Sequence, residues 1–105
     1  MIATPPRLDA MRAILVAVAN VYGISVNDLL GRSRTKGIAE ARALACYLAK
    51  RCTILSYPEI GSVLGRHHTT IMALVDSAGR IARKDARFAE VLSGLSGQLM
   101  KENTR

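Results

Sequence analysis

Apolar residues recur at helical spacing along almost the whole chain, and no stretch of useful length shows the alternation of a β-strand. The first periodic run comprises Leu8, Met11, Leu15, Val18 and Tyr22. Gly23 follows directly and predicts the end of this helix. Ser25 can cap a short second helix that runs through Asp28, Leu29 and Leu30, and another glycine, Gly31, ends it.

A polar and basic stretch bounded by Gly31 and Gly37 predicts a loop, and a long helix is expected from about Ile38 to Arg51. The apolar stripe of this helix contains Ile38, Ala41, Ala45, Leu48 and Cys52, with Leu44 beside it. Arg42, Lys50 and Arg51 lie off the stripe, so we expect them to face outward.

A short helix is predicted after Ser56, because Ser56 and Glu59 have the spacing of a capping box and Pro58 lies in the first turn. It carries Ile60, Val63 and Leu64 and meets Gly65. Another stripe begins almost at once and consists of Ile71, Leu74, Val75, Ala78 and Ile81.

The last helix is expected from about Asp85, with an apolar stripe of Phe88, Val91, Leu92, Leu95 and Leu99. Gly94 and Gly97 weaken it, so we expect its end to fray. The pattern therefore predicts an all-α fold in which six helices, two of them short, form a single domain over residues 1–105. Residues 1–7 are expected to be a flexible lead.

Composition supports helices packed closely together. Half of the 105 residues are hydrophobic, yet the chain has no Trp and one Phe. The core must therefore come from Ala, Leu, Ile, Val and Met, which favour helices over sheets.

The charge of the chain indicates the kind of partner that it binds. The net charge is +7 and the isoelectric point is about 10.1, which favours a polyanionic partner. The excess of basic over acidic residues is concentrated between Gly31 and Arg66, where Glu40 and Glu59 are the acidic residues. The basic residues there are Arg32, Arg34, Lys36, Arg42, Lys50, Arg51 and Arg66. Such a concentration is typical of a nucleic-acid-binding face.

Cys46 and Cys52 are six residues apart in one predicted helix, so their side chains lie about 9 Å apart along its axis. This is too far for a disulfide between them, and both are expected to be small buried apolar residues in a reducing compartment. No apolar run reaches the roughly 20 residues that span a bilayer, and residues 1–7 lack a signal-peptide pattern. We therefore expect a cytoplasmic protein.

The most informative stretch runs from Ser56 to Ile71, because a short capped helix, a glycine turn and a second helix make a helix-turn-helix. The second helix opens with the polar cluster Arg66, His67, His68, Thr69 and Thr70. Recognition helices place such N-terminal residues against base edges in the major groove. Histidine and threonine can hydrogen-bond to base edges, and arginine can bind guanine or a phosphate.

Two segments of this stretch resemble a known family pattern. They are Ser56-Tyr57-Pro58-Glu59-Ile60-Gly61 and Gly65-Arg66-His67-His68-Thr69-Thr70-Ile71. That pattern is Ser-Leu-Pro-Glu-Ile-Gly followed by Gly-Gly-Arg-Asp-His-Thr-Thr-Val, and it belongs to the C-terminal DNA-binding domain of DnaA, the bacterial chromosomal replication initiator. Upstream, Ser33-Arg34, Ala41-Arg42 and Leu48-Ala49-Lys50 have the family's spacing. The resemblance extends from about Met11 to Leu99.

The resemblance implies roles for individual residues. Arg34 matches an arginine that enters the adjacent minor groove, and His68 and Thr69 match contacts to bases in the major groove. Thr70, Arg42, Lys50 and Pro58 match positions that hold the phosphate backbone. We add His67 to the predicted base contacts and Arg66 to the predicted phosphate contacts, because both belong to the polar cluster that opens the second helix.

The chain departs from the family pattern at three points. His67 replaces an acidic residue, so a hydrogen-bond acceptor becomes a possible donor. The turn has one glycine, Gly65, where the family usually has two, and Ala73 takes a position that often contacts bases. We therefore expect DNA binding to persist with a changed target sequence.

Nothing in the chain resembles the phosphate-binding loop of the initiator's ATPase domain. We therefore expect no enzymatic activity and no cofactor. Because the chain begins with Met1, we expect a stand-alone protein that acts as a monomer on double-stranded DNA in the nucleoid. It would regulate transcription or replication, in the latter case by competing with the initiator for sites.

Other functions compete with this interpretation. A zinc site or a Cys–His nucleophile pair is conceivable from Cys46, Cys52, His67 and His68, but the spacing of these residues is not that of a metal site and the cysteines lie on an apolar stripe. A protein-interaction module that binds the initiator or another partner, with little affinity for DNA, is the main alternative. Binding to a membrane surface is disfavoured, because the basic residues do not follow one amphipathic helix.

Overall fold

The computed structural model describes residues 6–103 and the side chains of residues 9–100, and all its regular structure is helical. The helices are α1 (Pro6–Tyr22), α2 (Val26–Leu30), α3 (Lys36–Cys52), α4 (Tyr57–Leu64), α5 (His68–Lys84) and α6 (Ala86–Asn103). The prediction of six helices, two of them short, is confirmed. Of the predicted flexible lead 1–7, residues 1–5 lie outside the described residues, whereas Pro6 and Arg7 begin α1.

Local capping sets where the helices begin and end. Ser25 and Ser56 each form a capping box, with Asp28 and Glu59 as the reciprocal partners. Gly23 and Gly65 each take a φ of 66°, the left-handed conformation that ends a helix and that glycine adopts without strain. These four positions confirm the predicted end of α1, the predicted start of α2 and both predicted ends of α4.

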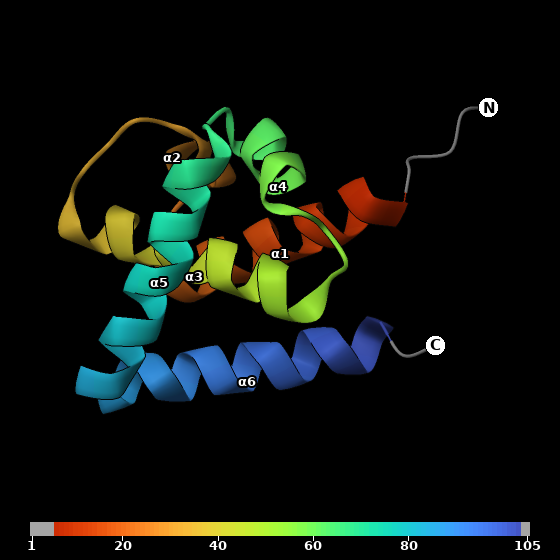
Figure 1. Ribbon diagram of the computed structural model, residues 1–105. Coiled ribbons are helices and arrows are strands. Elements are labelled where there is room, and N and C mark those ends of the chain that lie inside the picture. The colour runs from red at the N-terminus through yellow and green to blue at the C-terminus, as the bar shows by residue number, and fades with distance from the viewer. Residues whose placement is uncertain (1–5, 104–105) are drawn as a thin grey trace.

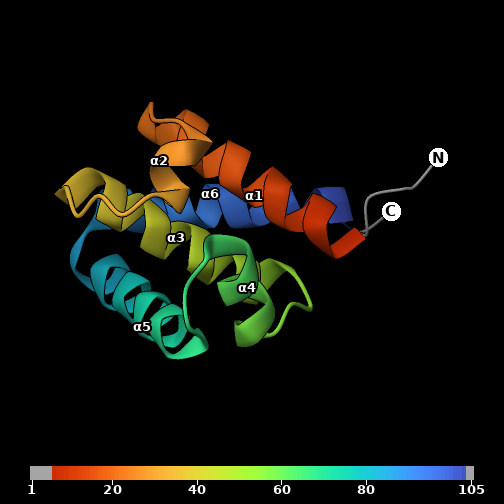
Figure 2. The ribbon, with the colours of Figure 1, turned by 90° about the horizontal axis from the view of Figure 1, so that it is seen from above.

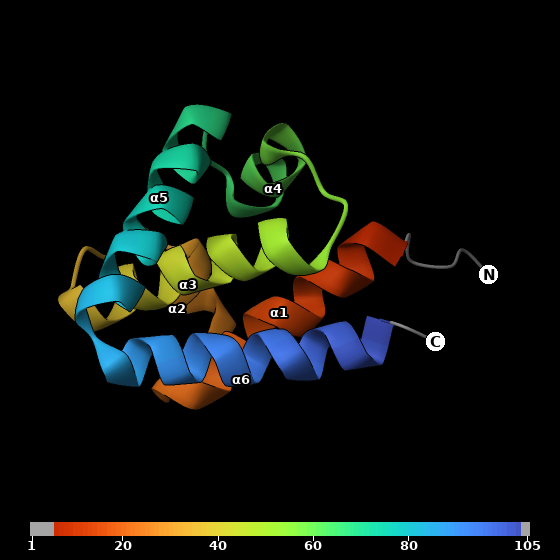
Figure 3. The same ribbon diagram turned by 60° about the horizontal axis from the view of Figure 1, so that its bottom comes forward.

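The helix α3 lies at the centre of the molecule and packs against each of the other five (Figures 1 and 2). A loop connects α2 to the start of α3, and the two helices pack together. The helix α6 follows α5 in the chain and runs beneath α1 and α3 (Figure 3). The N-terminal end of α1 and the C-terminal end of α6 lie at the same end of the molecule. Among the described helices, none is long and apolar enough to cross a membrane.

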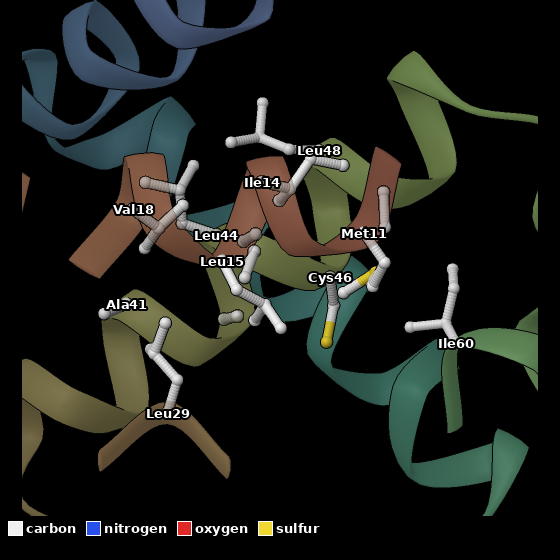
Figure 4. Packing of buried hydrophobic residues seen from close by; sticks show 14 of the residues in the cluster. Met11, Ile14, Leu15, Val18, Leu29, Ala41, Leu44, Cys46, Leu48 and Ile60 are labelled. Carbon is white, nitrogen blue, oxygen red and sulfur yellow. The ribbon is translucent and has the colours of Figure 1, made fainter. Parts of the chain in front are cut away.

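Apolar side chains from α1 and α3 form the largest part of the core. Figure 4 shows Met11, Ile14 and Val18 of α1 close to Leu44 and Leu48 of α3. Leu29 of α2 and Ile60 and Leu64 of α4 are also buried, so both short helices are held on the core by apolar side chains. This packing fixes α2 and α4 relative to α3 and thereby positions the loops beside them.

Two predictions about the helices need correction. The helix α3 starts at Lys36 and is buried on almost all sides, not along one stripe, because it touches all the other helices. The helix α6 continues through Gly94 and Gly97 to Asn103, and the expected fraying is not observed in its described part. Leu95 and Leu99 are buried and hold this half of α6 against the core.

Cys46 is fully buried in α3, and burial raises the pKa of its thiol to about 12 despite the opposing charges of Arg66 and Arg42. We expect native protein at neutral pH to resist alkylation of Cys46 by iodoacetamide, because a buried neutral thiol is a poor nucleophile. Peptide mass spectrometry with and without guanidinium measures this. Fast alkylation of Cys46 in the native protein would contradict the packing described here.

Candidate nucleic-acid interface

The α4–α5 pair has the geometry of a helix-turn-helix, with residues 65–67 between its helices. The backbone N–H of Arg66 donates to the carbonyl of Gly61 over 2.8 Å, which folds the turn back onto α4. A side chain at Gly61 would bring its Cβ closer than 3.0 Å to the Arg66 carbonyl oxygen. The turn therefore requires glycine at position 61 as well as at Gly65.

The start of α5 projects at the edge of the molecule away from α6 (Figures 1 and 3). Ile71 is fully buried and holds this end of the helix on the core. His67, Thr69 and Thr70 are exposed and His68 is half-buried. The polar cluster predicted to face DNA is thus presented to solvent while its helix is held firmly from behind.

His67 is the N-cap of α5 and lies before its first turn, whereas the sequence placed it inside the helix. Its Nδ1 accepts from the backbone N–H of Thr69 over 3.3 Å and lies 2.9 Å from the Thr69 hydroxyl. The imidazole of His68 lies beside it, with 4.2 Å between the ring centroids. These contacts hold the rings and the hydroxyl in one arrangement before any ligand binds.

The loop between α2 and α3 carries Arg34, which is exposed. The hydroxyls of Ser33 and Thr35 lie 3.0 Å apart, and the Ser33 hydroxyl accepts from the Thr35 backbone N–H. Arg34 lines a surface hollow of about 510 Å³ together with Arg32, Arg42, Arg66 and Thr70. The fold therefore brings the basic loop to the start of α5, although the two are more than 30 residues apart.

Arg42 does not face outward, so this prediction is wrong. The residue is 5% exposed, and its guanidinium donates to the carbonyls of Leu29 (2.8 Å), Gly31 (3.0 Å), Ser33 (3.0 Å) and Asp28 (3.1 Å). Burial and the neighbouring Arg66 lower its pKa. Four of its five N–H groups are committed to the backbone of α2 and the loop. Arg42 therefore positions the Arg34 loop, and its buried guanidinium is not presented to a phosphate as the sequence predicted.

Arg66 also has contacts within the protein. Its half-buried guanidinium donates to the Leu64 carbonyl over 2.9 Å and to the Gly31 carbonyl. Gly31 thus accepts from both Arg42 and Arg66. This shared carbonyl connects the loop to the turn of the helix-turn-helix.

Lys50 lies in the last turn of α3, beside the start of α4, where Pro58 lies. The Lys50 ammonium donates to the Leu55 carbonyl over 3.3 Å and lies 4.5 Å from the centre of the Tyr57 ring. Pro58 is exposed in the first turn of α4. The contact with Tyr57 is a cation–π interaction that holds the Lys50 charge beside the start of α4.

Sequence reasoning missed the positioning roles of Arg42 and Gly61 and the contact between Tyr57 and Lys50. An arginine flanked by alanines in a helix with small residues on all sides was the available signal for Arg42. Within the described side chains, no group of three His, Cys, Asp or Glu residues could hold a metal ion.

Comparisons with known proteins agree with this geometry. A family model described as the bacterial dnaA protein helix-turn-helix matches residues 11–77. The chromosomal replication initiator protein DnaA of Picosynechococcus sp. is 37% identical over 87 residues, which cover 82% of this chain and 19% of the relative. DnaA of Neisseria meningitidis is 41% identical over 78 residues, 73% of this chain and 15% of the relative.

DnaA of Rhodopseudomonas palustris is 36% identical over 97 residues, 91% of this chain and 20% of the relative. This chain thus spans about a fifth or less of the length of these relatives. A crystal structure described as a DNA replication initiation factor superposes with a TM-score of 0.80 at 29% identity, covering 91% of this chain and 30% of the other. The resemblance inferred from the motifs is confirmed, and the chain belongs to the bacterial DnaA helix-turn-helix family.

Proposed function

We propose that this protein binds double-stranded DNA sequence-specifically through α4 and α5. The start of α5 enters the major groove, where His67, His68 and Thr69 contact bases, and Arg34 enters the adjacent minor groove. The phosphate contacts are Lys50, Pro58, Arg66 and Thr70. Phosphate contacts supply most of the affinity in such a complex, and base contacts supply the discrimination.

The observation that carries this proposal is the exposed polar start of α5. It is capped by His67, held by the buried Ile71, and lies beside the Arg34 loop. A major groove about 12 Å wide admits a helix presented in this way. The net charge of +7 favours the approach of this face to phosphate backbone.

The proposed role is regulatory and non-catalytic. The chain matches the helix-turn-helix portion of its relatives, which is a small part of their length. A protein with this portion can occupy target sites without hydrolysing ATP. We propose that it regulates transcription or replication from the cytoplasmic nucleoid as a monomer on DNA, in the case of replication by competing with the initiator for sites.

Selection of bound duplexes from a random DNA pool tests the proposed function. We expect one enriched motif, with log affinity that falls against log salt by about 0.9 for each phosphate neutralised. Weak binding with no enriched motif and little dependence on salt would contradict DNA recognition. That result would instead support a protein-interaction module that binds the initiator or another partner.

Replacing Thr69 by valine is expected to weaken binding to the selected site by about 1–3 kcal/mol and to reduce discrimination, because valine keeps the shape and removes the hydroxyl. Replacing Lys50 by methionine should weaken all duplexes about equally and lower the salt dependence. Fluorescence anisotropy with the selected duplex and a scrambled one measures both effects. Unchanged sequence preference in Thr69→Val would remove this residue from the base contacts.

A further inference from the structure

His67 has a fixed arrangement of hydrogen-bond donor and acceptor. Its Nδ1 faces the start of α5, 3.3 Å from the backbone nitrogen of Thr69. A backbone N–H can only donate, so Nδ1 must accept. A neutral imidazole that accepts at Nδ1 carries its proton at Nε2. The cap therefore determines the tautomer of His67.

The outer edge of the His67 ring is available to a ligand. Nε2 lies on the side of the imidazole away from the capped backbone, and the side chain is exposed. Within the described residues, the hydrogen bonds of His67 are all made by Nδ1 or the backbone. Nε2–H is thus a donor that points away from α5 without a partner in this part of the chain.

A second contact fixes the orientation of the ring. The half-buried His68 lies against His67, with a centroid separation of 4.2 Å and 36° between the ring planes. Rotation of His67 would break the cap at Nδ1 and disturb this ring contact. The direction of Nε2–H is therefore set before binding, which lowers the conformational cost of a directed hydrogen bond.

We propose that His67 determines base specificity as an obligate donor, with Nε2–H directed at an acceptor on the major-groove edge. This inference rests on the proposed DNA binding. Guanine offers two acceptors, O6 and N7, whereas cytosine offers the N4 donor. At the position that faces His67, guanine is therefore favoured most and cytosine least.

The test compares the wild type with His67→Asp and His67→Asn on duplexes that carry each base pair in turn at every position of the selected motif. Both replacements keep a side-chain oxygen that can cap α5. The carboxylate of His67→Asp has acceptors only, whereas the amide of His67→Asn retains a donor. Circular dichroism checks that helix content is unchanged.

We expect the wild type to favour guanine over cytosine at one position by roughly fivefold or more, the effect of one hydrogen bond. His67→Asp should shift that preference toward cytosine, His67→Asn should keep guanine, and the other positions should not change. An unchanged motif in His67→Asp would overturn the inference, as would the same altered preference in both variants. If His67→Asp binds no duplex, loss of the guanine preference in His67→Asn overturns the inference and its retention supports it.

These outcomes are distinct from failure of the proposed function. A wild-type protein that enriches no motif contradicts sequence-specific DNA binding as a whole. A wild-type protein with a clear motif that neither variant alters contradicts only the role of His67.

Discussion

Replacing Arg42 by methionine is expected to lower the free energy of unfolding by about 3 kcal/mol, because it removes four hydrogen bonds to backbone carbonyls at the end of α2 and in the loop. A domain of this size has about 5–15 kcal/mol of stability in total. The melting temperature should therefore fall by more than about 10 °C. Thermal unfolding followed by circular dichroism measures the effect.

Two further variants distinguish the role of Arg42 in positioning the Arg34 loop from a direct contact with DNA. Arg42→Lys keeps the positive charge but cannot reproduce the planar fork that reaches carbonyls on both sides, so it should also be destabilised. Arg32→Met removes an exposed charge from the same loop and should leave stability within about 0.5 kcal/mol. If Arg42→Met melted like the wild type and only bound DNA more weakly, Arg42 would be a phosphate contact after all.

Replacing Gly61 by alanine is expected to have an effect at least as large, with a loss of about 3 kcal/mol or more. The added Cβ would lie closer than 3.0 Å to the Arg66 carbonyl oxygen and 3.5 Å from the His68 backbone nitrogen. These atoms belong to the turn and to the first turn of α5, and backbone cannot yield as a flexible side chain can. The angle between α4 and α5 must then change, and DNA binding should fall with it.

Gly79→Ala is the matched control, because Gly79 lies within α5 and an added Cβ there would meet nothing within 4 Å. This variant should gain about 0.5–1 kcal/mol, the helix preference of alanine over glycine. Chemical denaturation of both variants and amide chemical shifts around residues 61–68 provide the comparison. A Gly61→Ala protein as stable as Gly79→Ala would show that the turn tolerates a side chain at position 61.

The sequence alone determined the helices and most of their ends. Ser25 and Ser56 each form a capping box with a residue three positions later in the chain. Gly23 and Gly65 end their helices through their own left-handed backbone conformation. Such interactions are local, so they follow from short segments without knowledge of the fold. The helix-turn-helix and the polar start of α5 could be predicted for the same reason, and the motif was sufficient to indicate the family.

Only the tertiary structure decided that Arg42 is buried, that Gly61 lies against the turn, and that the Arg34 loop lies beside the start of α5. Small residues occupy all sides of α3, so its periodicity could not indicate that the side carrying Arg42 would be covered by α2 and the loop. The close approach at Gly61 and the shared contacts at Gly31 join atoms that only chain reversal brings together. The physical reason is that burial and hydrogen bonding across loops depend on how the helices pack, which a helix's own sequence does not specify.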